Sequence, residues 1–204
     1  MKKVLGSLVL VGILATGSMA NYYEPKNVEP ASDEIEMECT NDAAFRDLKI
    51  SIHCSKLRIG WYTKKGRMDV VYNEMNSLGY YYSRMGDYKK AIKYTLQSAE
   101  GFKKLGIKAG EADSYKGLGD IYSEKNKDKA IEYYAKASEL YKAAGIKEGE
   151  ADSYNQLGVI YEGIDKGKSI EYYTKAYEIY KSIGDSFSAH DILYKIKELK
   201  KKKH

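Results

Sequence analysis

The chain has 204 residues, of which 31% are charged and 43% are hydrophobic, and its net charge is +5. Four of the positive charges are the consecutive residues Lys200–Lys203, which leaves +1 for the rest of the chain. A nucleic-acid-binding fold is expected to carry a basic face of its own, so this balance argues against a nucleic-acid partner. The three histidines and two cysteines show no CxxC or HxxxH spacing, which argues against a metal site.

Residues 1–20 have the pattern of a secretory signal peptide. Lys2 and Lys3 form a positive start, Val4–Ala15 is an apolar run, and Ser18–Ala20 offers small residues for cleavage. The run is shorter than the ~20 residues of a membrane span, so an uncleaved anchor is the less favoured alternative. We therefore expect an exported protein, periplasmic or secreted, with no integral membrane segment after cleavage. The lysine-led signal suggests a bacterial source.

Residues 21–41 are predicted to be a disordered acidic linker. This stretch holds both prolines of the chain, Pro25 and Pro30, together with six acidic residues and few large apolar ones. Such a composition cannot bury enough apolar surface to offset the conformational entropy lost on folding.

Residues 42–66 are predicted to form an N-terminal capping helix. Phe45, Leu48, Ile52 and Ile59 have the spacing of one helical face, although Leu48–Ile52 also alternates as a strand would. Gly66 ends this segment, and Asp69 is a good candidate for the N-cap of the next helix.

Cys39 and Cys54 are the only cysteines. Export would place them in an oxidising compartment, where a disulfide between them is expected. A loop of this length would stabilise the fold by about 3 kcal/mol in the chain-entropy model. Two free thiols are the alternative.

Residues 67–186 contain three copies of one pattern. Gly106, Gly145 and Gly184 recur 39 residues apart and fit the ends of helices. A Leu-Gly pair recurs as well, with its glycines inside predicted helices, where glycine is unfavourable and close approach of a paired helix is the usual reason. These pairs end in Gly79, Gly119 and Gly158, and the small residues expected to face them are Ala91, Ala130 and Ser169. Helical patterning at a period of about 20 to 50 residues indicates a stacked-helix array.

This pattern resembles the tetratricopeptide repeat (TPR) family. Met85–Ile92 is similar to the family's turn and the start of its second helix. The unit of 39–40 residues resembles the longer variant of the repeat. The resemblance implies an all-α solenoid of three helical hairpins with a capping helix at each end. The positions that match the family signature in the second unit are Tyr115, Leu118, Gly119, Tyr122, Ala130, Tyr134 and Ala137.

Residues 187–204 are predicted to form the C-terminal capping helix and a lysine-rich tail. Ile192, Leu193, Ile196 and Leu199 would form the buried face of this helix. Terminal units of a repeat array need a polar outer side, which the opposite face of this helix would provide.

The resemblance also implies that the first helix of each unit lines a concave groove. Asparagine can pair with a peptide backbone because its side chain both donates and accepts hydrogen bonds. A merely solvated concave face is the alternative. The groove residues carried over by this resemblance are Asn73, Asn76, Tyr80, Lys116, Asp120, Asn155, Val159 and Tyr194, and among them Asn76, Lys116, Asn155 and Tyr194 fall at equivalent positions.

These features predict a non-catalytic scaffold or adaptor that binds a protein or peptide in its groove and needs no cofactor. An enzyme is disfavoured because the chain has no Gly-x-Ser-x-Gly motif, phosphate loop or metal-ligand spacing. The alternative function is a self-associating structural protein of the cell envelope, for example a homodimer.

Overall fold

The computed structural model describes residues 25–26, 31–32, 35, 39 and 47–201. The predicted signal peptide, residues 1–20, lies outside the described residues. Between residues 47 and 201 the regular elements are eight α-helices, and no strand occurs there. Their bounds are α3 (Leu48–Lys64), α4 (Met68–Arg84), α5 (Tyr88–Leu105), α6 (Lys108–Tyr122), α7 (Lys127–Ala144), α8 (Lys147–Tyr161), α9 (Lys166–Ser182) and α10 (Ser186–Lys201).

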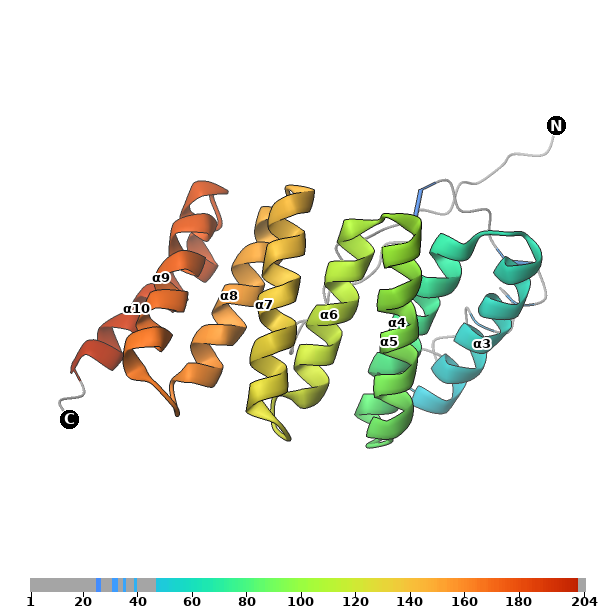
Figure 1. Cartoon of the computed structure of the whole chain (residues 1–204), viewed down its shortest axis with the longest axis horizontal. Helices are drawn as coiled ribbons and strands as arrows, with labels where there is room; N and C mark the ends of the chain where they lie inside the picture. Colours follow the sequence, from blue (N-terminus) through green and yellow to red (C-terminus); the bar gives the residue numbers. More distant parts are fainter. Residues whose placement is uncertain (1–24, 27–30, 33–34, 36–38, 40–46, 202–204) are drawn as a thin grey trace.

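The helices stand side by side in one extended row, with α3 near one end and α10 at the other (Figure 1). The closest packing is within the pairs α4–α5, α6–α7 and α8–α9, and α3 and α10 pack on the first and last of these pairs. The first helices α4 and α6 also contact each other. This is the predicted arrangement of three helical hairpins between two capping helices.

Close helix packing explains two of the glycines inside first helices. A Cβ atom added to Gly119 would lie 2.7 Å from the Tyr134 ring, and one added to Gly158 would lie 2.6 Å from the Tyr173 ring. The predicted close approach is therefore confirmed. The small residues expected to face these glycines are only part of the contact, because the Tyr134 and Tyr173 rings of the second helices fill the space beside Gly119 and Gly158. Ser169 takes part through its hydroxyl, which donates to the Gly158 carbonyl at 2.8 Å.

The predicted helix ends are mostly confirmed. Gly106 and Gly145 are the C-cap residues of α5 and α7, with φ of 70° and 74°. Gly184, with φ 79°, directly follows Ile183, the C-cap residue of α9. The N-cap prediction for Asp69 is wrong. Arg67 occupies that position, and Asp69 lies in the first turn of α4, where its carboxylate accepts from the Arg67 guanidinium at 2.8 and 3.0 Å. An acidic residue in a first turn is favourable to the helix dipole.

Leu48–Ile52, which alternates as a strand would, is the start of helix α3. The Asp47 side chain caps this helix by accepting from the Lys49 backbone N–H at 2.7 Å. The Cys39 and Cys54 sulfurs are within bonding distance and both residues are buried, so they form the predicted pair. Most of the predicted linker, and residues 42–46, lie outside the described residues.

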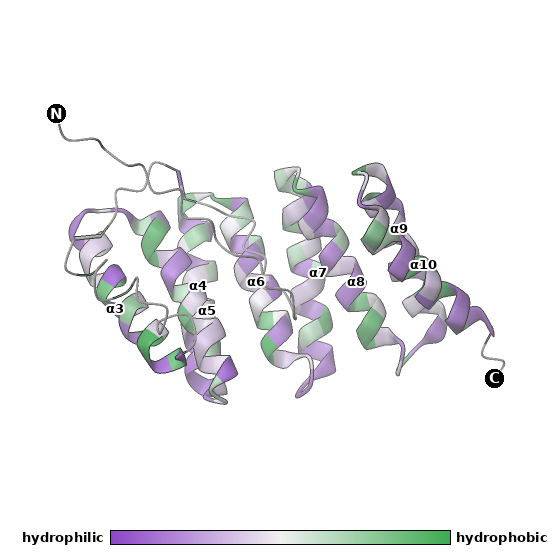
Figure 2. Cartoon of the chain, turned by 180° about the vertical axis from the view of Figure 1, so that it is seen from behind, coloured by the Kyte–Doolittle hydropathy of each residue, from purple (hydrophilic) through white to green (hydrophobic). Residues whose placement is uncertain are grey.

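The core consists of several clusters of buried side chains spread along the row, and it is rich in tyrosine. Tyr134, Tyr141, Tyr173 and Tyr180 come from the second helices and are buried. Apolar and polar segments alternate along every helix, as expected for helices that each bury one stripe (Figure 2). The described helices include none that combines the length and the apolar character needed to cross a membrane.

The C-terminal capping helix, α10, begins at Ser186, so its start differs by one residue from the predicted boundary. It buries Ile192, Ile196 and Leu199 as predicted, with Ala189 in addition, whereas Leu193 is half-buried. This face packs against α9 and closes the C-terminal end of the core.

Candidate functional site

A cleft of about 620 Å³ lies where α4, α6 and α8 end and α7 begins. It brings together three predicted groove residues, Tyr80, Asp120 and Val159, each of which directly follows the glycine of a Leu-Gly pair. Because these positions are equivalent in the three units, the cleft is a product of the repeat. Ile121 and Ile160 add apolar surface to its walls.

The polar floor of the cleft is a carboxylate held by a tyrosine. The Tyr134 hydroxyl, from α7, donates to Asp120 Oδ1, from α6, at 2.5 Å. Burial raises the pKa of Asp120, although Lys116 and the hydrogen bond from Tyr134 act in the opposite direction. Burial and the neighbouring Asp120 also raise the pKa of Tyr134, so its hydroxyl keeps the proton that it donates.

The same arrangement recurs through the second and third units. Tyr141 donates to Asp113 Oδ1 at 2.5 Å, and Tyr180, its equivalent in the third unit, donates to Asp152 Oδ1. Tyr173, the equivalent of Tyr134, donates to Glu162. In each case a second helix supplies the donor, and the carboxylate comes from the preceding first helix or, for Glu162, from its C-cap residue. The row of acids on α6 and α8 is therefore oriented by the tyrosine core.

Lys116 lies within the packed layer and is only 3% exposed. Its Nζ is 4.0 Å from Asp152 Oδ2, so it pairs α6 with α8. Asn76, the equivalent residue of the first unit, is 2% exposed. These two predicted groove residues thus form part of the support beneath the surface, and a ligand on the surface would not reach them without displacing their neighbours.

The other predicted groove residues lie outside the cleft. Asn155 and Asn73 are half-buried on α8 and α4, and Tyr194 is 60% exposed on α10. The Oδ1 atom of Asn155 is buried and accepts no hydrogen bond from the described residues. The predicted column through Asn76, Lys116, Asn155 and Tyr194 therefore does not form one continuous exposed surface.

Two cations stand at the edge of the cleft. Arg84, at the end of α4, donates from Nη1 to the Tyr80 hydroxyl at 3.2 Å, and its guanidinium lies 5.8 Å from the Tyr80 ring centre. Lys127, at the start of α7, reaches the end of α8, since a Cβ atom added to Gly163 would lie 3.5 Å from its Nζ. Both cations are thus placed at helix C-termini, where positive charge is favourable.

The family model for the tetratricopeptide repeat matches residues 70–143 and 128–182. The chain belongs to the tetratricopeptide repeat family. A search of the curated proteins finds no match.

Two solved structures resemble this TPR protein in fold. BtubC (BKLC) from P. vanneervenii has a TM-score of 0.51 and 17% sequence identity, over 82% of this chain and 85% of that one. A Signal Transduction ATPase with Numerous Domains (STAND) protein with a tetratricopeptide repeat sensor, from Pyrococcus horikoshii, has a TM-score of 0.67 and 22% identity. That alignment covers 83% of this chain but 26% of the archaeal one. At these identities the likeness concerns the TPR fold alone.

The TPR resemblance did not identify the residues that complete the cleft. Tyr134 was named only as a position of the family signature, and Lys127, Ile121 and Ile160 were not singled out. A usable signal was present, because an acid on a first helix and a tyrosine on the next helix recur in two consecutive repeats. Among the described residues, no group of three or more His, Cys, Asp or Glu side chains is arranged to hold a metal ion.

Proposed function

We propose that this TPR protein is an exported, non-catalytic adaptor that holds a peptide segment of a protein partner in the cleft between α4, α6 and α8. The observation that carries the proposal is the cleft itself, which repeats one position in three successive units. Its lining combines the aliphatic side chains of Ile121, Val159 and Ile160 with a larger number of polar and charged ones, so a ligand would find both apolar contact area and hydrogen-bonding partners there.

The exposed side chains suit a peptide ligand. Val159 is 44% exposed and Tyr80 is partly exposed, so both offer apolar contact area at the surface. Ile121 and Ile160 lie deeper in the cleft, and the Tyr134–Asp120 pair and Arg84 provide polar contacts. A peptide side chain can enter such a cleft while its backbone follows the row of first helices.

Two features support export. Residues 1–20 have the signal-peptide pattern, and Cys39 and Cys54 are placed to form a disulfide. Disulfides persist in oxidising compartments and are rare in the cytosol. A periplasmic or extracellular location fits both.

The test is site-specific photo-crosslinking in the native cell. A photoreactive amino acid replaces Val159 in the cleft, and the matched control replaces Glu139, an exposed residue of α7. We expect a discrete crosslinked partner from position 159 that is missing from position 139. Identical products from both positions, or none from position 159, would contradict binding in the cleft.

Self-association is the second candidate, and α10 favours it. Phe187 is 86% exposed and Tyr194 is 60% exposed, and their separation by seven residues places them on one face of this terminal helix. Crosslinks from position 187 to a second copy of the chain, without a foreign partner at position 159, would favour this function over the adaptor.

A further inference from the structure

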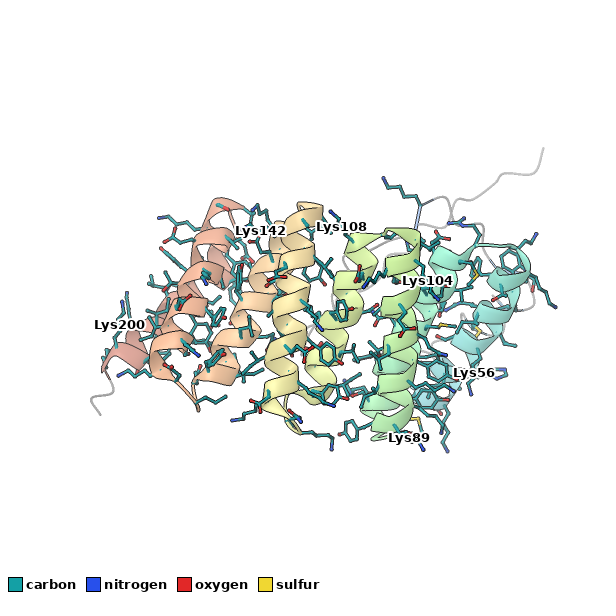
Figure 3. All side chains as sticks on the ribbon, viewed as in Figure 1. Lys56, Lys89, Lys104, Lys108, Lys142 and Lys200 are labelled. Atoms are coloured by element: carbon teal, nitrogen blue, oxygen red, sulfur yellow. A yellow bond between two sulfur atoms is a disulfide. The ribbon has the colours of Figure 1, made fainter. Side chains whose placement is uncertain are left out.

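Charge is divided unevenly between the two sets of helices in the repeats. The first helices α4, α6 and α8 carry eight acidic and four basic residues, whereas the second helices α5, α7 and α9 carry six acidic and thirteen basic ones. Lys89, Lys104 and Lys142 of the second helices, which are labelled in Figure 3, are all exposed. The nearly neutral repeats are thus strongly polarised.

The cleft lies on the acidic side of this division. Asp120 forms its floor and Glu124 lies at its edge. The last turns of α4, α6 and α8 converge there, and each helix C-terminus carries a partial negative charge. Farther along the same layer, Asp152 and Glu162 are held in place by tyrosines.

The cations near the cleft lie beneath its surface or at its edge. Lys116 is buried and pairs with Asp152, while Arg84 donates to the neutral Tyr80 hydroxyl and keeps its positive charge at the edge. Lys127 extends toward the end of α8. The carboxylate of Asp120 has a neutral hydrogen-bond donor in Tyr134, and that donor leaves its negative charge in place.

We propose that the peptide held in this cleft is basic, with a lysine or arginine side chain directed at Asp120, an inference that rests on the proposed function above. An ammonium or guanidinium group would form a charge-assisted hydrogen bond with a carboxylate that is already oriented. The basic second helices would repel the same peptide from the opposite side. Electrostatic complementarity of this kind provides both specificity and faster association.

The test uses three fluorescent peptides of equal length that carry Lys, Glu or Gln at the same positions, and it measures binding to the full protein by fluorescence anisotropy. We expect the Lys peptide to bind about tenfold more tightly than the Gln peptide at low salt. The Asp120→Asn variant, which keeps an acceptor for Tyr134, should weaken Lys-peptide binding about tenfold. The matched control Glu139→Gln removes one charge from the outer side and should change it less than about twofold.

A stability measurement separates lost binding from lost folding. Lys116, Tyr134 and Asp152 are the groups that act on Asp120, and its pKa is raised chiefly by burial. Since the folded pKa lies above the unfolded one, the contribution of Asp120 to stability is favourable in acid and is lost as the pH rises toward neutral. Asp120→Asn should therefore melt at or above the wild-type temperature at neutral pH.

The outcomes distinguish this inference from the proposed function. The variant Val159→Phe fills the mouth of the cleft without adding charge. If the Glu or Gln peptide binds best and Val159→Phe abolishes that binding, the cleft holds peptides but the basic ligand class is wrong. If the Lys peptide binds equally well to wild type and Asp120→Asn, the inference is also overturned. A concentration-dependent dimer that is lost when Lys200–Lys203 become alanine would instead overturn the adaptor function while supporting the basic ligand class, because the occupant would be the lysine-rich tail of a second copy.

Discussion

The first repeat and the two that follow build the same hairpin from different chemistry. In the second and third repeats, buried tyrosines of the outer helix donate to carboxylates on the preceding helix. In the first repeat, Thr95 and Phe102 occupy the equivalent positions. The Thr95 hydroxyl donates to the Ala91 carbonyl of its own helix at 2.9 Å, and the Phe102 ring packs edge-on against Tyr72.

This difference shows that the hairpin does not require the tyrosine–carboxylate pairs. A threonine or a phenylalanine fills the same space, and the helices of the first repeat pack as closely as those of the other two. Buried charged groups are costly unless they are paired, so an apolar alternative would be at least as stable. The tyrosine–carboxylate pairs therefore occur at the cleft and along the acidic first helices α6 and α8. Their presence in two repeats fits a binding role better than a packing role.

The largest expected effect concerns the end of the molecule that bears the first repeat. Replacing Cys39 and Cys54 by serine removes the link to α3 and should cost about 3 kcal/mol in the chain-entropy model. Because each repeat contacts only its neighbours, the loss should be concentrated in α3 and α4. Hydrogen exchange measured helix by helix checks this. An equal increase in the exchange rate across α8 and α9 would show that the stability of the last repeat is coupled to that of the first.

The next effect tests the tyrosine–carboxylate pairs directly. Tyr141→Phe removes the donor to Asp113, which is buried, and should cost about 2 kcal/mol of unfolding free energy in urea. Tyr180→Phe is the matched variant, and its cost should be smaller because water can reach the side chain of Asp152, which is 22% exposed. No cost for Tyr141→Phe would show that the second repeat depends on its tyrosine–carboxylate pair no more than the first repeat, which has none. Equal costs for the two variants would show that the exposure of the acid has no effect.

A smaller loss is expected at a close contact between two helices of the second repeat. Gly119→Ala would push a methyl group against the Tyr134 ring, which must shift to accept it, at a cost of about 1.5 kcal/mol. Gly163→Ala is the control, since its added atom would only contact the end of the flexible Lys127 side chain. Thermal unfolding of the two variants side by side measures the difference. A neutral Gly119→Ala would mean that this ring is free to move.

The smallest effect belongs to the basic outer side. Lys136 donates to Glu132 at 2.6 Å on the exposed face of α7, and this hydrogen bond lowers the pKa of Glu132. Any contribution to stability is thus present at neutral pH and lost as the pH falls below the usual range of glutamate. We expect Glu132→Gln to leave the melting temperature unchanged within error at neutral pH, because exposed ion pairs contribute little. A clear loss would show that this face has a packing role.

Local pattern was sufficient for the repeat itself. The Leu-Gly pairs and the glycines at 39-residue spacing predicted the hairpins, and the left-handed caps at Gly106 and Gly145 agree. Local pattern was weaker at boundaries. Asp69 was expected to cap α4, but the preceding Arg67 pairs with it and moves the cap position two residues back. The contact between Arg67 and Asp69 depends on side-chain geometry, which the N-cap propensity of a single residue does not describe.

The site was only partly predictable. Equivalent positions in successive repeats were expected to face one groove, and Tyr80, Asp120 and Val159 do line one cleft. It does not extend to Lys116 and Asn76, which the packing of neighbouring first helices buries. A ligand can reach a position on a first helix only where the neighbouring first helices are far enough apart. The repeat period does not give the distance between these helices.

The amino-acid sequence by itself determined the fold class, the number of repeats and the family, because helical periodicity and glycine placement act over short distances along the chain. The tertiary structure alone decided which tyrosine meets which carboxylate, where the cleft opens and which cations lie beneath its surface or at its edge. Those features join residues that are far apart in the sequence. Lys116 pairs with Asp152, and the cleft brings Tyr80 of the first repeat together with Val159 of the third. Only the three-dimensional packing brings such residues within reach of one another.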